Sequence, residues 1–201
     1  MRLLMLAGPG AGKGTQAERL SAHYGVEHVA SGDLLRAEVA AGTDVGQSAE
    51  AAMNRGDLVP DDVILEMIGL RLLEASQRGG YVLDGYPRNL AQAKRAFEMA
   101  REVGNIELQA VVHLQVDRDE LLRRMLARAE EEGRLDDTRA TIEHRLEIFD
   151  EQTQPLVGYY TDRGLVYTID GNQHVEDVTK AILEALADLA DDDGSAERSS
   201  A

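Results

Sequence analysis

Apolar residues in this chain are grouped into short runs, and each run is followed by a longer segment in which they recur at helical spacing. The runs are residues 2–7, 80–85, 108–116 and 165–170. Each is bounded by glycine, proline or polar residues, and a short apolar run between such breakers is typical of a buried strand. We predict that these runs are the strands of one sheet.

Between and after the strands, apolar residues recur three or four positions apart, as in a helix that buries one face. The predicted helices are residues 13–23, 31–42, 48–55, 61–76, 89–103, 118–132, 139–153 and 174–190. Ser31 is a candidate N-cap, and the helix that starts at residue 139 is predicted to end shortly before Pro155. Strands that alternate with helices predict an α/β fold, with a mostly parallel sheet and helices on both faces.

Length and charge narrow the possible functions. The 201 residues are within the range of one domain, and 21 basic against 37 acidic residues give a formal net charge of −16. This excess of acid disfavours nonspecific nucleic-acid binding, which needs a basic surface. An anionic ligand would need a local basic pocket, and lysine occurs only at positions 13, 94 and 180.

The chain contains no cysteine, which excludes disulfides and thiolate metal sites. It has no recognisable signal peptide, and no apolar run approaches the roughly 20 residues of a membrane helix. We therefore expect a soluble, cytoplasmic protein without membrane contact. Residues 188–201 are small, polar and acidic, and we expect them to form a disordered tail.

A glycine-rich turn, GPGAGKGT at residues 8–15, connects the first predicted strand to the first predicted helix. Glycines let a backbone curl so that several N–H groups face one phosphate, and the start of the helix adds its positive end. Lys13 would add a full charge. A plain glycine-rich turn would explain the same residues, but alternating glycines around a lysine at a strand-to-helix junction favour phosphate binding.

The form GPGAGKGTQ resembles the nucleoside monophosphate kinases, and among them the adenylate kinases most closely. In that family GKGT is the ordinary form, although Ala7 stands where the family usually has glycine. The resemblance extends over residues 1–187 and includes SGDLLR (31–36), DLVP (57–60) and LDGYPRNLAQ (83–92). It implies a P-loop NTPase-type sheet with an inserted segment for the nucleoside monophosphate (NMP) and a short lid. The implied division is a core of residues 1–29, 60–127 and 139–187, an NMP-binding insert of residues 30–59, and a lid of residues 128–138.

The resemblance assigns one set of residues to AMP. Arg36 and Arg88 would bind its phosphate, and Gln92 would read the adenine edge, because an amide donates and accepts at once. The implied AMP-binding residues are Ser31, Arg36, Asp57, Leu58, Val59, Gly85, Tyr86, Pro87, Arg88, Gln92, Arg134 and Arg145. The chain has Asn at position 89, as the pyrimidine monophosphate kinases often do, which leaves UMP or CMP open as acceptors, whereas Gln92 points back to adenine.

A second set would bind ATP and magnesium. Arg124 and Arg128 are four residues apart and share a helix face, where like charges are unfavourable without an anion nearby. The implied ATP-binding residues are Gly10, Ala11, Gly12, Lys13, Gly14, Thr15, Arg124, Arg128 and Gln173. Asp84 would hold Mg²⁺ through water. Only five residues separate Arg128 from Arg134, which is the short-lid form, so we expect no zinc.

The implied reaction is Mg·ATP plus AMP giving two ADP. The nucleophile, an AMP phosphate oxygen, is already anionic, so no general base is needed and catalysis depends on positioning and charge. The expected catalytic residues are Lys13, Arg88, Arg128, Arg134 and Arg145. We expect a monomer whose partners are ATP, AMP and ADP. The alternatives are a UMP/CMP-type kinase and a non-catalytic adenine nucleotide sensor. In the sensor, Ala7 would be the change that explains the loss of turnover.

Overall fold

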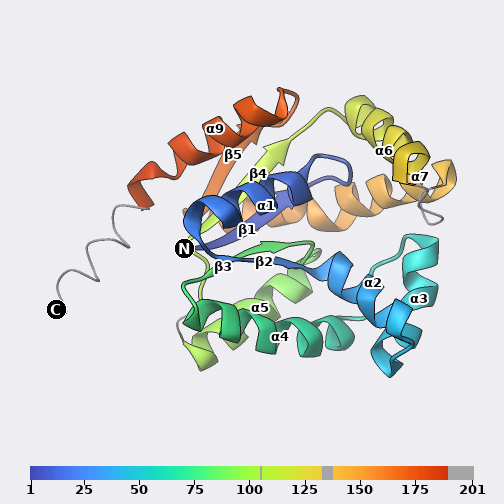
Figure 1. The fold of residues 1–201 in the computed structure, drawn as a ribbon, viewed down its shortest axis with the longest axis horizontal. Helices are drawn as coiled ribbons and strands as arrows, with labels where there is room; N and C mark the ends of the chain where they lie inside the picture. Colours follow the sequence, from blue (N-terminus) through green and yellow to red (C-terminus); the bar gives the residue numbers. More distant parts are fainter. Residues whose placement is uncertain (105, 133–137, 190–201) are drawn as a thin grey trace.

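A parallel sheet forms the centre of the molecule. The computed structural model describes residues 1–104, 106–132 and 138–189. Five parallel strands lie in the order β2-β3-β1-β4-β5 (Figure 1). They are β1 (Arg2–Ala7), β2 (Glu27–Ala30), β3 (Tyr81–Asp84), β4 (Ala110–Gln115) and β5 (Val166–Asp170). The predicted α/β fold with a parallel sheet is confirmed.

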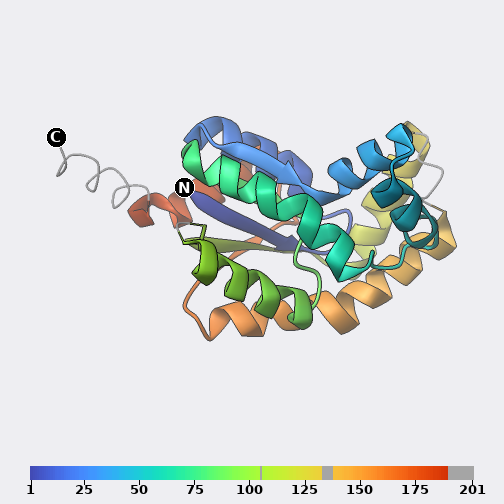
Figure 2. The same cartoon turned by 90° about the horizontal axis from the view of Figure 1, so that it is seen from below.

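Helices cover both faces of this sheet, as the two views show (Figures 1 and 2). The helices are α1 (Lys13–Tyr24), α2 (Ser31–Ala41), α3 (Asp44–Arg55), α4 (Asp61–Gln77), α5 (Leu90–Val103), α6 (Arg118–Glu132), α7 (Arg139–Ile148), α8 (Pro155–Thr161) and α9 (Val175–Ala185). A π-helical turn, η1 (Phe149–Thr153), joins α7 to α8. None of the described helices combines the length and apolarity needed to cross a membrane.

The alternation of side chains along β1 explains the two layers. Successive residues of a strand point to opposite faces. Leu3 and Met5 pack with residues of α1 and α9 on one face, while Leu4 and Leu6 pack with residues of α4 and α8 on the other. Because both faces are covered, the strand is apolar from Leu3 to Ala7 rather than alternating.

Two elements differ from the sequence-based prediction. The edge strand β2 was not predicted, because only Val29 among its residues is fully buried and no apolar run marks it. The helix from residue 139 was predicted to end before Pro155, but η1 continues it and α8 begins at that proline. Proline is tolerated there because the first turn of a helix needs no N–H donor.

The connections that follow the carboxyl ends of the strands build the walls of a cleft. After β2, the chain forms the packed pair α2 and α3, and after β4 it forms α6 and α7, which contact each other (Figure 1). The helices α2 and α3 lie within the predicted insert of residues 30–59. Part of the predicted lid, residues 133–137, and most of the predicted tail, residues 190–201, lie outside the described residues. The domain boundaries stay predictions.

Candidate active site

The glycine-rich turn forms a tight loop between β1 and α1. Gly10 and Gly12 have φ angles of 83° and 88°, which residues with a side chain rarely adopt, and α1 begins directly after them. A Cβ on Gly10 would lie 2.7 Å from Cγ of Met125, so α6 packs closely against this loop. Gly12 is the N-cap and no described side chain caps the first turn, so α1 presents backbone N–H groups as an anion site does.

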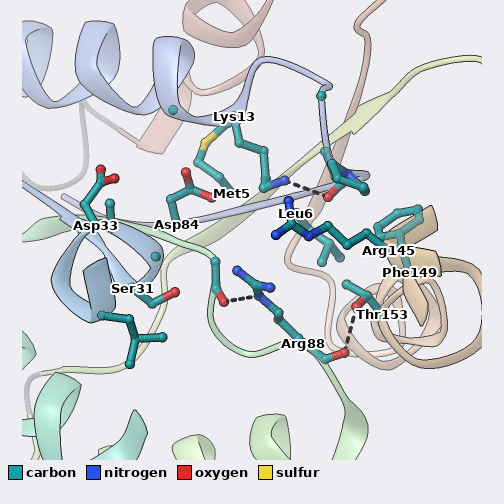
Figure 3. A pocket seen from close by; sticks show the side chains of 18 of the residues that line it. Met5, Leu6, Lys13, Ser31, Asp33, Asp84, Arg88, Arg145, Phe149 and Thr153 are labelled. Carbon is teal, nitrogen blue, oxygen red and sulfur yellow. Dashed lines mark hydrogen bonds between the residues drawn. The ribbon is translucent and has the colours of Figure 1, made fainter. Parts of the chain in front are cut away.

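Lys13 folds back over the same loop. Its Nζ donates hydrogen bonds to the carbonyl oxygens of Ala7 at 2.9 Å and Gly8 at 3.1 Å (Figure 3). Ala7 is the last residue of β1 and is buried, so alanine occupies an ordinary strand position. Alanine at position 7, where the family that this chain resembles usually has glycine, therefore leaves the loop intact.

A cavity of about 520 Å³ opens beside the loop. It is lined from the loop, α2, the segment after α3, the loop after β3, and helices α6 and α7. The cationic residues that line it are Lys13, Arg36, Arg88, Arg124, Arg128 and Arg145. Cations from five separate parts of the fold thus share one cleft in a chain whose net charge is −16.

The electrostatics of Lys13 show how close these charges lie. Burial lowers the pKa of the Lys13 ammonium, and the Asp84 carboxylate partly opposes this shift. The guanidinium groups of Arg88 and Arg128 then lower the Lys13 pKa further, which is mutual repulsion of like charges. An anion between these groups would relieve the repulsion, so the cleft is built for a highly charged anionic ligand.

Asp84 supplies a carboxylate at the carboxyl end of β3, paired in the sheet with Met5 and Ala30. A Cβ on Gly14 would lie 3.9 Å from an Asp84 carboxylate oxygen, which places that carboxylate beside the first turn of α1 (Figure 3). The described residues contain no group of three or more His, Cys, Asp or Glu side chains that could hold a metal. A metal at Asp84 would therefore depend on its ligand and on water for most of its contacts.

Ser31 and Arg88 meet at Gly85, on the side of the cleft opposite Lys13. Gly85 has φ 86°, and a Cβ there would lie 2.5 Å from Oγ of Ser31 and 3.3 Å from Nη2 of Arg88. Ser31 is almost fully buried at the start of α2. Arg36, one turn further along α2, pairs with Asp33 at the rim. Only glycine leaves room for these groups to converge.

Gln92, in the first turn of α5, is fully buried and lines the cleft. Its Oε1 accepts a hydrogen bond from the Arg88 N–H at 2.7 Å, and its Nε2 donates to Asp61 at 2.6 Å. One amide hydrogen and one lone pair are left for a ligand. Asn89 caps α5 by accepting from the Gln92 N–H at 2.8 Å, so its identity has a structural reason unrelated to the acceptor base.

A second cavity of about 360 Å³ lies on the other side of the loop. Its walls include Ala11, Arg124 and Gln173, which the resemblance assigned to ATP, and also Arg123. Glu120 bonds both arginines at 2.7 Å, and these bonds lower its pKa to about 2. Glu120 thereby fixes Arg124 at the junction of the two cavities.

Most of the predicted site residues are brought together. The main cleft is lined by Gly10, Gly12, Lys13, Gly14, Thr15, Ser31, Arg36, Asp57, Leu58, Val59, Asp84, Gly85, Pro87, Arg88, Gln92, Arg124, Arg128 and Arg145. Tyr86 instead lies in the core, where its hydroxyl donates to the Gln92 carbonyl oxygen at 3.3 Å. Arg134 is outside the described residues.

The structure adds residues that the sequence did not indicate. Met53, Phe149 and Thr153 also line the main cleft. Arg145 reaches from α7 to α3, where its Nη2 donates to the Met53 carbonyl oxygen at 3.4 Å. No motif marks these positions, and the segment that contains Phe149 and Thr153 reads as ordinary helix.

Comparison with known proteins gives one consistent family. A family model described as adenylate kinase matches residues 5–165. The chain is 45% identical over 190 residues to an adenylate kinase of Thermobifida fusca (strain YX), covering 94% of this chain and all of that protein. It is 48% identical over 186 residues to an adenylate kinase of Synechococcus sp. (strain RCC307), covering 92% and 98% of the two chains. An adenylate kinase of Stenotrophomonas maltophilia (strain R551-3) is 43% identical over 186 residues, covering 92% and 99%.

Proposed function

The chain belongs to the adenylate kinase family, and we propose that the cleft described above carries out the family's reaction, reversible phosphoryl transfer from Mg·ATP to AMP to give two ADP. The observation that carries this assignment is the set of cations around one cavity, with Lys13 and Arg88 facing each other across it (Figure 3). Neighbouring phosphates of two nucleotides are the anions that would balance such a set.

The proposed reaction depends little on proton transfer. An AMP phosphate oxygen attacks the terminal phosphorus of ATP, the new P–O bond forms, and the bond to the bridging oxygen of the leaving ADP breaks. The nucleophile carries its own charge, so no general base is needed. Lys13, Arg88, Arg128 and Arg145 stabilise the charge on the moving group, and the loop and the start of α1 hold the phosphates of ATP.

Magnesium would be held by Asp84 together with the phosphates. Mg²⁺ keeps much of its water shell and is usually bound by one or two carboxylates plus substrate oxygens. The Asp84 carboxylate, beside the first turn of α1, matches that donor set. Bound there, the ion would supply positive charge to the phosphate chain of ATP, while Asp84 also compensates Lys13.

The two cavities would separate the two nucleotides. The AMP residues gather around Gly85, with Gln92 offering one donor and one acceptor to the base. The ATP base would lie in the second cavity, between Arg124 and the backbone at Gln173. A short lid at residues 128–138, which would carry Arg134 and hold no zinc, would close over the phosphates and exclude water. We further propose that the enzyme acts as a cytoplasmic monomer.

The test is ADP formation from Mg·ATP with AMP, UMP, CMP, GMP or no acceptor, beside a Lys13→Ala control. We expect fast turnover with AMP alone, lost in the control. Preference for UMP or CMP would refute the assignment of Gln92 and the adenine site. Binding of both adenine nucleotides without transfer to any acceptor would refute the enzyme and leave a sensor.

A further inference from the structure

Thr153 has no role in the reaction as derived so far, yet its side chain is held in a particular place. It is one of the few buried polar residues in the described part of the chain, with 7% of its surface exposed. Its hydroxyl donates a hydrogen bond to the main-chain carbonyl oxygen of Arg88 at 2.7 Å (Figure 3). The two residues are 65 positions apart, so this bond joins two separate parts of the fold at the cleft.

Thr153 is the last residue of the π-helical turn. The Gln154 N–H donates to the Phe149 carbonyl oxygen at 2.8 Å, a bond five residues long that widens the helix locally. Before the turn, Ile142 and Leu146 belong to the core on one face of the sheet. After it, Leu156 and Tyr160 belong to the core on the other face. The turn thus lies where one continuous helix passes from one core to the other, and π-helical turns recur at functional sites.

Arg88 is held by its main chain and by the Nε of its guanidinium, and its side chain lines the cleft. Its N–H donates to Gln92 Oε1 and its Nε donates to the Gly85 carbonyl oxygen, both at 2.7 Å. The bond from Thr153 secures the remaining main-chain group, the carbonyl oxygen. The first two anchors come from Arg88's own loop and the helix after it, so Thr153 is the anchor that ties this loop to a distant element.

We propose that Thr153 is a positioning residue for Arg88. It lies on the helix that continues from α7, which carries Arg145, so its bond sets the loop of one phosphate-binding arginine against the helix of another. The inference rests on the proposed function, because it assigns Arg88 to the AMP phosphate. Loss of the hydroxyl would let the Arg88 loop shift, and AMP binding would weaken more than ATP binding.

The experiment compares Thr153→Val, which keeps the shape and removes the donor, with Thr153→Ser, which keeps the donor. Thr161→Val is the matched control, because the Thr161 hydroxyl donates to a carbonyl oxygen at the same 2.7 Å, at an exposed position of α8. Calorimetric titration with AMP alone gives Kd, steady-state rates give kcat and KM for each nucleotide, and thermal unfolding gives Tm. Thr153→Ala serves as a second variant without the donor.

We expect Thr153→Val and Thr153→Ala to raise the Kd of AMP about tenfold, which is about 1.4 kcal/mol. The KM of ATP should stay within twofold, Thr153→Ser should restore the Kd of AMP, and Thr161→Val should change nothing. In an Arg88→Ala background, Thr153→Val should add little to the Kd of AMP, because its effect passes through Arg88.

Two results would overturn the proposal. One is an unchanged Kd of AMP in Thr153→Val, and the other is equal weakening of both nucleotides that tracks Tm and persists in Thr153→Ser. AMP binding is measured without turnover, so it remains readable if the wild-type protein transfers no phosphoryl group. A wild-type protein that binds AMP but transfers no phosphoryl group would refute the proposed function and not the role of Thr153.

Discussion

Replacing Gly85 by alanine places one methyl group where Ser31 and Arg88 come together, on the side of the cleft that is proposed to bind AMP. The added Cβ would lie 2.5 Å from Oγ of Ser31 and 3.3 Å from Nη2 of Arg88. Ser31 is almost fully buried and has little room to move, whereas the end of Arg88 can swing away. The substitution also forces a side chain onto a backbone with φ 86°.

The two costs can be estimated separately. A left-handed conformation costs a non-glycine residue about 1–2 kcal/mol. Overpacking against a buried group adds roughly 1–3 kcal/mol. The sum, about 2–5 kcal/mol, would lower the Tm of a protein of this size by roughly 4–20 °C. Displacement of the Arg88 guanidinium would raise the KM of AMP at least about tenfold while leaving the KM of ATP nearly unchanged.

Substitutions at two other glycines distinguish the cost of the positive φ angle from the cost of the steric clash. Gly25 has φ 65° with open space where a Cβ would stand, so Gly25→Ala should show the conformational cost alone. Gly158 lies inside α8 in ordinary helical conformation, also with open space, and Gly158→Ala should be neutral or stabilising by about 0.5–1 kcal/mol. If Gly85→Ala loses no more stability than Gly25→Ala and keeps its KM for AMP, the close approach of Ser31 and Arg88 does not build the site.

Three further substitutions test other parts of the site. Lys13→Ala should lower kcat by about 10²–10³ with little loss of Tm, because it removes charge that acts mainly on the transferred group; a kcat within tenfold of wild type would argue against that role. Asn89→Ala should cost about 1 kcal/mol of stability through loss of the α5 cap, and the ratio of rates with AMP and UMP should stay constant; a changed ratio would give Asn89 a part in base recognition. Glu120 has a folded-state pKa lowered to about 2 from a usual value near 4.5, so the stability it contributes is fully present above about pH 4.5 and is lost as the pH falls towards 2. Glu120→Gln should therefore flatten the dependence of Tm on pH in that window, and an unchanged slope would show that the pairs of Glu120 with Arg123 and Arg124 add nothing.

Much of the fold could be predicted because its signals are local. The apolar run of β1 is buried on both faces, and the glycines after it are needed for positive φ angles and close packing against α6. Strand β2 has no such signal, since it is a short edge strand with polar residues. The π-helical turn is hidden for a different reason, because one extra residue in a turn hardly disturbs the apolar spacing.

The site shows the same division between residues that point into the cleft and residues that hold them there. Arg88 and Gln92 stand in a motif, so their presence at the cleft was predictable. The bonds between the Arg88 N–H and Gln92, and between the Arg88 carbonyl oxygen and Thr153, join groups whose proximity follows only from the complete fold. Gln92 illustrates the consequence, because an amide assigned to a base from sequence already uses part of its hydrogen-bonding capacity to position an arginine. In the proposed AMP site, base recognition and phosphate recognition therefore share one side chain, and a change at Gln92 should alter both.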